Sequence, residues 1–143
     1  MNKIQEAKMM CKNAHKNQTR KYTGEKYFNH PFRVYKILEK LNASQDLQIS
    51  GLLHDVLEDT DVKDKTIKEK FGVKVLKLVK EVTGYGNIKT REGLTLKLAD
   101  MLDNIKDIPK NKQYLKQRIQ EMNKMQKRLH YEKNVNEIIE DMV

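Results

Sequence analysis

With 143 residues, of which 38% are hydrophobic, the sequence is long enough to enclose one core without a disulfide framework or a structural metal. The single cysteine, Cys11, excludes an intrachain disulfide, and no apolar run approaches the roughly 20 residues that a membrane-spanning helix needs. Charged residues interrupt the first turns of the chain, which argues against a signal peptide there. We therefore expect a single cytoplasmic domain over residues 1–143.

The formal net charge of +9 favours an anionic partner, such as a nucleotide or a nucleic acid, through electrostatic steering. Lysine supplies 24 of the 29 basic residues, however, and the lysines are spread along all the expected helices with few aromatic residues between them. Surfaces that read nucleic acids usually combine arginine with aromatic side chains. We interpret the charge mainly as a solvated lysine-rich surface and keep nucleic-acid binding as the less favoured alternative.

Apolar residues recur at three- and four-residue steps along most of the sequence, which indicates amphipathic helices. Prolines and most glycines fall at the expected helix ends. The fold class predicted is all-α, a compact single-domain bundle of about seven or eight helices. The expected helices span about residues 3–17, 31–42, 44–58, 64–71, 73–82 and 90–108, followed by two within 112–143.

Particular residues set the expected boundaries. Residues 18–29 lack an apolar period and are expected to form a loop, after which Pro31 suits the first turn of a helix. Ser44 is a good N-cap for the third helix. Gly84-Tyr85-Gly86 predicts a hinge or turn, and Pro109 should stop the helix before it.

Ionisable residues cluster at the end of the expected third helix, in His54-Asp55-Val56-Leu57-Glu58-Asp59. On one helix, His54 with Glu58 and Asp55 with Asp59 would stack in two adjacent columns. Three acids so close together on an apolar helix repel one another and lose solvation unless a cation or a proton neutralises them. They also oppose the helix dipole. This segment therefore predicts metal binding or catalysis, and a solvated acidic helix end is the alternative.

Two other residues are candidates for the same site. His30 by itself is more often a core or surface residue than a ligand, whereas Asp100 lies in an apolar stretch of helix and needs a partner there. Two imidazoles and two carboxylates suit an octahedral Mn²⁺ or Fe²⁺ ion better than a structural zinc site. Such an ion lowers the pKa of bound water and polarises a phosphoryl oxygen, while Glu58 and Asp59 can move the proton. The sequence therefore predicts phosphate-ester hydrolysis.

Three segments in this order resemble the HD-domain metal phosphohydrolases. They are Arg20-Lys21-Tyr22-Thr23-Gly24-Glu25-Lys26-Tyr27-Phe28-Asn29-His30-Pro31, His54-Asp55-Val56-Leu57-Glu58-Asp59-Thr60 and Lys97-Leu98-Ala99-Asp100-Met101-Leu102-Asp103-Asn104. In detail the sequence is similar to the hydrolase half of the RelA/SpoT homologues and to stand-alone small alarmone hydrolases, such as the metazoan SpoT homologue. The resemblance implies an HD-type helical fold and a small-molecule nucleotide substrate, guanosine tetra- or pentaphosphate (ppGpp or pppGpp). The products would be GDP or GTP and diphosphate.

The resemblance also implies residue roles. The implied ligands of one Mn²⁺ ion are His30, His54, Asp55 and Asp100. The implied catalytic pair, which activates and positions the attacking water, is Glu58 and Asp59. The implied substrate-binding residues are Arg20 and Lys21 beside the nucleotide and Asn104 at the ribose. His15 would support the loop without binding the metal.

Some positions depart from the family pattern. Met101 and Asp103 stand where the family typically has Arg and His, and Asp107 stands where a Thr often helps to hold the nucleotide. The segment between Thr83 and Leu96 is shorter than in long alarmone hydrolases. Two alternatives therefore stay open: an HD phosphohydrolase acting on another phosphorylated nucleotide or a pyrophosphorylated RNA end, and a non-catalytic helical domain that binds nucleic acid or protein.

Overall fold

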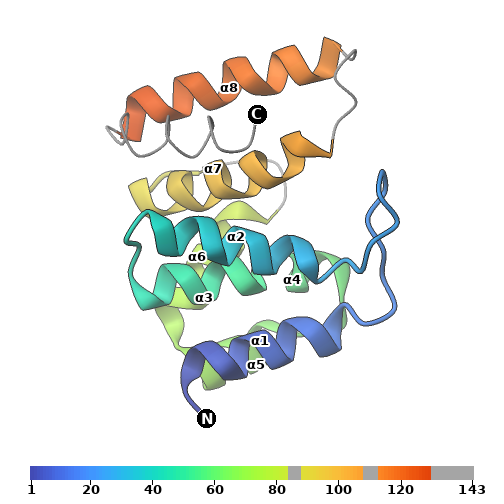
Figure 1. Ribbon diagram of the computed structural model, residues 1–143. Coiled ribbons are helices and arrows are strands. Elements are labelled where there is room, and N and C mark those ends of the chain that lie inside the picture. The colour runs from blue at the N-terminus through green and yellow to red at the C-terminus, as the bar shows by residue number, and fades with distance from the viewer. Residues whose placement is uncertain (84–87, 108–112, 130–143) are drawn as a thin grey trace.

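The computed structural model describes residues 1–83, 88–107 and 113–129, which form helices and no sheet (Figure 1). The helices are α1 (Lys3–Ala14), α2 (Asn29–Lys40), α3 (Gln45–Leu53), α4 (Val56–Asp59), α5 (Asp64–Phe71), α6 (Val73–Val82), α7 (Arg91–Lys106) and α8 (Gln113–Leu129). Thr19 and Lys26 form an isolated antiparallel bridge in the loop before α2. None of the described helices is long and apolar enough to span a bilayer. The predicted all-α fold is confirmed.

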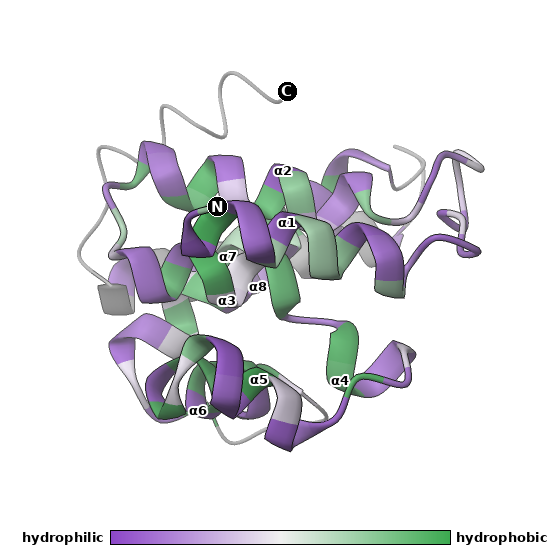
Figure 2. Ribbon diagram, turned by 90° about the horizontal axis from the view of Figure 1, so that it is seen from below, coloured by the Kyte–Doolittle hydropathy of each residue, from purple (hydrophilic) through white to green (hydrophobic). Residues whose placement is uncertain are grey.

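Helices α2, α3 and α7 form the centre of the bundle, because α2 packs against both α3 and α7 and these two also pack against each other. Figure 1 shows α8 over the far side of α7 and α1 beneath α3. Hydrophobic and hydrophilic residues alternate around the labelled helices in Figure 2, as expected for amphipathic helices. The three central helices carry the candidate ligands, so their packing sets the geometry of the site.

Two groups of buried side chains hold these helices together. One group lies between α2, α6 and α7 and includes Leu38 and Leu98. The other joins α1, α3 and α6 and includes Ala7 and Leu52. At Gly51 the backbones of α2 and α3 approach closely, because a Cβ there would lie 2.6 Å from a methyl carbon of Leu38. Close-packed contacts of this kind leave the central helices little freedom to shift.

Most of the expected boundaries agree with the structure. Helices α5 and α6 have the predicted bounds, and the hydroxyl of Ser44 accepts a hydrogen bond from the backbone N–H of Leu47 at the start of α3. The first helix ends at Ala14, three residues earlier than expected. The predicted turn at 84–86, the stop at Pro109 and the second closing helix lie outside the described residues.

The expected continuous helix over 44–58 is wrong in one respect, because the chain breaks at His54 and Asp55. Helix α3 ends at Leu53, and α4 begins at Val56 after Asp55 adopts φ −105° and ψ −2°. Successive side chains on a regular helix point about 100° apart. The break instead brings His54 Nε2 to 3.0 Å from Asp55 Oδ2, so both side chains serve one site.

Candidate metal centre

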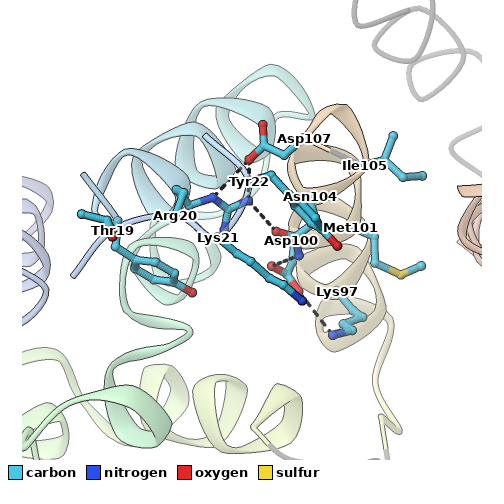
Figure 3. A pocket seen from close by; sticks show the side chains of 11 residues that line it. Thr19, Arg20, Lys21, Tyr22, Lys97, Asp100, Met101, Asn104, Ile105 and Asp107 are labelled. Carbon is cyan, nitrogen blue, oxygen red and sulfur yellow. Dashed lines mark hydrogen bonds and ion pairs between the residues drawn. The ribbon is translucent and has the colours of Figure 1, made fainter. Parts of the chain in front are cut away.

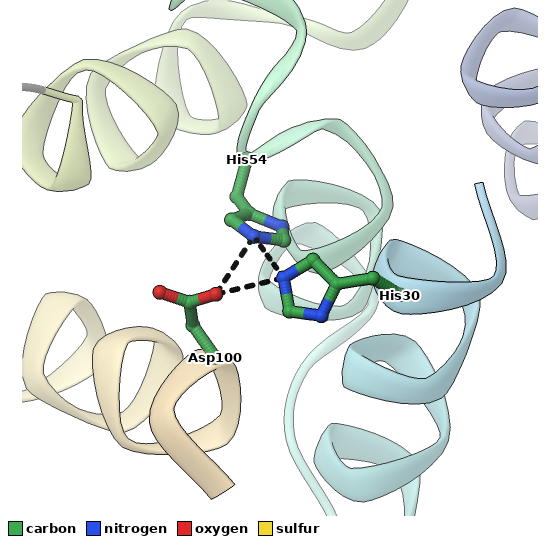
Figure 4. A group of neighbouring side chains, drawn as sticks. All are labelled: His30, His54 and Asp100. Atoms are coloured by element: carbon green, nitrogen blue, oxygen red, sulfur yellow. Dashed lines mark hydrogen bonds and ion pairs between the residues drawn. The ribbon is translucent and has the colours of Figure 1, made fainter. Parts of the chain in front are cut away.

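Three side chains from the three central helices meet at one point (Figure 4). His30 lies in the first turn of α2, His54 caps the end of α3, and Asp100 lies within α7. The two Nε2 atoms are 3.2 Å apart, and they lie 2.8 and 3.2 Å from Asp100 Oδ1 for His30 and His54 respectively. All three residues are buried, so the cluster is largely removed from solvent.

Asp55 adds a fourth group to this cluster. Its Oδ2 atom lies 3.0 Å from His54 Nε2 and 3.7 Å from His30 Nε2. The same oxygen accepts a hydrogen bond of 2.6 Å from the hydroxyl of Tyr27. The structure therefore brings together all four residues that the sequence singled out as metal ligands.

The outer ring nitrogens of the two histidines determine which atoms face the cluster. His54 Nδ1 donates to the backbone oxygen of Gly51 over 2.7 Å, because a carbonyl can only accept. His30 Nδ1 likewise donates to Asp103 Oδ2 over 2.6 Å. In the neutral imidazoles both Nε2 atoms then carry lone pairs, which face each other and the oxygens of Asp55 and Asp100. Four acceptors that converge in this way need a cation or shared protons, and a mixed nitrogen and oxygen set fits a divalent metal ion.

The charges of the cluster reinforce this interpretation. Burial lowers the pKa of His54, but the carboxylates of Asp55 and Asp100 outweigh it and raise that pKa well above its ordinary value. Burial raises the pKa of Asp100, but the hydrogen bonds that His30 and His54 donate when their Nε2 atoms carry protons hold that pKa well below the ordinary range. The carboxylates thus stay ionised and attract positive charge, which a metal ion supplies more strongly than a proton.

Glu58 and Asp59, the expected catalytic pair, are exposed residues of α4, three and four residues after Asp55 in the chain. The backbone of Asp59 is held on both sides, since its N–H donates to Asp55 O over 3.0 Å and its carbonyl accepts from Gln18 Nε2 over 2.8 Å. Burial, and then the charges of Asp55 and Glu58, raise the pKa of the Asp59 carboxyl. A carboxylate with a raised pKa is a better proton acceptor.

A cavity of about 610 Å³ adjoins the cluster and is lined in part by its member Asp100 (Figure 3). Tyr27, which donates to Asp55, also lines the cavity. Its other lining residues are Thr19, Arg20, Lys21, Tyr22, Lys97, Met101, Asn104, Ile105 and Asp107. All three residues expected to contact the nucleotide are in this set. The cavity therefore has cationic groups, an amide and apolar side chains beside the candidate metal centre.

Inside this cavity the side chain of Arg20 is already engaged. Its Nη2 donates to Asn104 Oδ1 and to Asp107 Oδ2, each over 2.9 Å, and its Nε donates to Asp107 Oδ2 over 3.2 Å. Asn104 in turn donates to Asp100 Oδ1 over 3.2 Å, and Lys97 Nζ lies 3.3 Å from Asp100 Oδ2. Asp107, one of the departures from the family pattern, thus ties Arg20 to α7.

Some residues of the site were missed in the sequence. Tyr27 holds Asp55, and Asp103 holds His30, yet neither was expected to have a role. A signal existed for Asp103, because a residue three positions after Asp100 lies on the same side of a helix. Tyr27 lies in an irregular loop, where no periodicity indicates which way a side chain points. His15, expected to support the loop, lies against the Tyr27 ring with 4.9 Å between centroids.

Comparisons with known proteins agree with this geometry. The family model described as HD domain matches residues 7–127. A guanosine-3′,5′-bis(diphosphate) 3′-pyrophosphohydrolase of Aquifex aeolicus is 40% identical over 123 residues, which cover 73% of this chain but 18% of that protein. The enzyme of the same name, MESH1, of Drosophila melanogaster is 35% identical over 115 residues, covering 68% of this chain and 64% of that one. The chain thus spans less than a fifth of the Aquifex relative and under two thirds of MESH1.

A solved structure is also similar over nearly the whole chain. It is that of a metazoan ortholog of SpoT that hydrolyses ppGpp, and it matches with a TM-score of 0.77 at 26% identity. The match covers 99% of this chain and 96% of that one. The all-helical arrangement described above is therefore the arrangement of that structure too.

Proposed function

This chain belongs to the HD domain family, and on that premise we propose that it hydrolyses the 3′-diphosphate of guanosine tetra- or pentaphosphate. The products would be diphosphate and GDP or GTP. The observation that carries the proposal is the convergence of His30, His54, Asp55 and Asp100 beside a cavity lined by cationic side chains. The choice of nucleotide comes from the names of the relatives, and the cavity is the proposed place where it binds.

The proposed metal is one Mn²⁺ ion held by those four residues, because two imidazoles and two carboxylates suit a metal of intermediate hardness. When bound, such an ion would polarise a phosphoryl oxygen and lower the pKa of a water molecule. The chain's own part is to hold the four ligand atoms in register through Gly51, Tyr27 and Asp103.

Glu58 and Asp59 are the proposed groups that take the proton from the attacking water and hold that water in place. Both lie on α4, three and four residues after the proposed ligand Asp55, and both are exposed. The raised pKa of Asp59 suits a proton acceptor near neutral pH better than an ordinary aspartate does. The backbone of Asp59 is hydrogen-bonded on both sides, which limits its movement.

The cavity is the proposed nucleotide site. Lys21 and Lys97 offer charge to phosphate groups, while Met101 and Ile105 offer apolar surface to the nucleoside. Arg20 and Asn104, expected beside the nucleotide, line the same cavity but are bonded to each other. A bound nucleotide would therefore meet a pre-formed Arg20 network rather than a free guanidinium.

Two further expectations belong to this proposal. We keep the single hydrolase domain over residues 1–143, which the family match over 7–127 supports. We also keep a cytoplasmic location, because the one cysteine, Cys11, is a buried free thiol that needs no oxidising compartment.

The test is the release of diphosphate from guanosine tetraphosphate by the purified chain with Mn²⁺. We expect turnover that stops on addition of EDTA and returns with excess Mn²⁺. A parallel assay with RNA carrying a 5′-triphosphate separates the alternative substrate from the proposed one. Release from RNA alone, or from neither substrate by a chain with bound metal, would refute the nucleotide assignment.

A further inference from the structure

Asp103 is a fully buried carboxylate on α7, one turn beyond the candidate ligand Asp100. Each of its oxygens accepts a short hydrogen bond. Oδ2 accepts from His30 Nδ1 and Oδ1 accepts from Arg33 Nε, both over 2.6 Å. Lys106 Nζ also lies 3.1 Å from Oδ1, at the edge of the protein. Asp103 therefore lies directly behind one ligand histidine, on the side away from the cluster.

The contacts continue from Asp103 to the loop before α2. Arg33 Nη2 donates to Glu25 Oε1 over 2.6 Å, and Nη1 donates to Glu25 Oε2 over 3.2 Å. This paired geometry holds a guanidinium in one plane and one orientation. A continuous series of hydrogen bonds thus links the loop, α2 and α7 to Nδ1 of His30, running from Glu25 through Arg33 and Asp103.

We propose that Asp103, held by Arg33, is a positioning residue for the metal centre. It keeps the His30 ring in the tautomer with hydrogen on Nδ1 and fixes the ring's rotation, so that the Nε2 lone pair faces the cluster. A carboxylate behind a ligand histidine also makes that ligand a stronger electron donor. The inference rests on the metal centre of the proposed function, but it does not depend on which nucleotide is hydrolysed.

The role requires two acceptor oxygens at this position. An asparagine offers one acceptor and one donor. If its oxygen accepts from His30, its NH₂ group faces the N–H of Arg33, and two donors oppose each other. If its NH₂ group faces His30 instead, the ring must take the other tautomer, and a hydrogen then occupies Nε2 in the cluster. Either arrangement weakens the binding of a cation between His30, His54 and Asp100.

The test measures the affinity of the purified full chain for Mn²⁺ by calorimetry at one fixed pH. We expect Asp103→Asn to weaken binding by about 10- to 100-fold, the usual range for partners of ligand histidines. The matched control is Asp64→Asn, which removes a carboxylate from an exposed ion pair with Lys80 and should leave the affinity unchanged. Equal affinities for Asp103→Asn and Asp64→Asn would overturn the proposal.

A second substitution tests the mechanism rather than the loss alone. Arg33→Met alone should weaken binding less than Asp103→Asn does, because Asp103 then keeps both acceptor oxygens, the hydrogen bond from His30 and the ion pair with Lys106. In the double variant Asp103→Asn/Arg33→Met the amide oxygen can accept from His30 with no guanidinium opposing its NH₂ group. The side chain of Lys106 is about one third exposed and can turn to solvent. The double variant should therefore bind Mn²⁺ more tightly than Asp103→Asn does. Equal or weaker binding would contradict the proposed positioning of His30 by Asp103.

A measurement on the unaltered chain does not depend on how the variants fold. With diamagnetic Zn²⁺ bound, the ¹⁵N chemical shifts of His30 should show hydrogen on Nδ1, and hydrogen on Nε2 would refute the assignment. Metal affinity and nucleotide turnover are read separately. If the unaltered chain hydrolyses no alarmone but Asp103→Asn still weakens Mn²⁺ binding, the positioning role of Asp103 is supported and the proposed function is rejected.

Discussion

The hydroxyl of Tyr27 donates a 2.6 Å hydrogen bond to Oδ2 of Asp55, the same oxygen that lies 3.0 Å from His54 Nε2. The Tyr27 ring contacts two imidazoles, with 4.9 Å between its centroid and that of His15 and 5.9 Å between its centroid and that of His30. Burial, and then the charge of Asp55, raise the pKa of Tyr27, so its hydroxyl remains a donor at neutral pH. Tyr27 therefore fixes the orientation of Asp55 within the cluster.

Tyr27→Phe removes that donor and keeps the ring. We expect Mn²⁺ binding to weaken by about tenfold, because a hydrogen bond to a charged group is worth about 1.5 kcal/mol or more and Asp55 would gain rotational freedom. Calorimetric titration measures the change. Tyr35→Phe is the matched control, since the Tyr35 hydroxyl donates to Glu39 over 3.0 Å within α2 and has no metal-binding partner. Identical dissociation constants for the two variants would show that Tyr27 has no positioning effect.

Asp55→Ala removes one of the four converging groups. We expect it to abolish both metal binding and hydrolysis, because His30 and His54 would then face a single carboxylate, that of Asp100. Metal content after dialysis and diphosphate release are measured on the same preparation. Full activity in an Asp55→Ala sample with bound metal would exclude Asp55 as a ligand.

The helices of the fold could be predicted because their signals are local. The apolar spacing and Gly72 were enough to place α5 and α6, and the Ser44 cap was enough to begin α3. The break between α3 and α4 was not predictable in this way. The stretch around His54 and Asp55 continues a helical pattern, and the chain departs from it because both side chains reach one cluster with His30 and Asp100. Tertiary contacts decided the local conformation there.

Glu58→Ala tests the proposed proton transfer. Because Glu58 is exposed on α4 and lies outside the group of His30, His54 and Asp100, the variant should still bind Mn²⁺. Its turnover should fall by about two orders of magnitude or more, the usual effect of losing a general base. Steady-state kinetics and metal content are compared with Glu69→Ala, which removes another exposed glutamate, one beside Lys65. Undiminished turnover would remove Glu58 from the mechanism.

The sequence indicated some residues of the candidate site and gave no sign of others. Spacing alone indicated charge compensation at His54 and Asp55, while the resemblance to a family was needed to add His30 and Asp100. The network around Arg20 could not be foreseen, because Asp107 lies 87 positions away in the sequence and the pairing depends on how the loop packs against α7. Partners of this kind are set by packing between distant segments.

Asp107→Asn should release Arg20 from its nearer charged partner, since the other, Asp103 Oδ2, lies 4.0 Å from Arg20 Nη2. Arg20 now shares its Nε and Nη2 donors with Asp107 Oδ2, so a phosphate group or a base must compete with that carboxylate. We expect the variant to show a KM for guanosine tetraphosphate about threefold to tenfold lower, with kcat little changed, because the gain applies equally to substrate and transition state. Asp64→Asn again provides the control for loss of an acidic group. A higher KM in Asp107→Asn would mean that the ion pair itself shapes the nucleotide site.

The start of α7 depends on a close contact between Glu81 and Gly93. The carboxylate of Glu81 accepts hydrogen bonds from the backbone N–H groups of Lys89 and Thr90, over 3.1 and 3.0 Å, and from the Thr90 hydroxyl. The same hydroxyl accepts from the N–H of Gly93 over 2.9 Å, capping the helix. A Cβ atom at Gly93 would overlap with Oε2 of Glu81.

Gly93→Ala should therefore destabilise the chain, although alanine in a helix normally stabilises it by about 1 kcal/mol relative to glycine. We expect a loss of about 1–3 kcal/mol in the free energy of unfolding, because the Glu81 carboxylate must leave its three donors to make room. Thermal and denaturant unfolding followed by circular dichroism measure it. In a Glu81→Ala background the overlap disappears, and Gly93→Ala should become neutral or stabilising. A stabilising effect of Gly93→Ala in the unaltered chain would show that Glu81 moves aside without cost. The start of α7 would then not depend on the hydrogen bonds of Glu81 to Lys89 and Thr90.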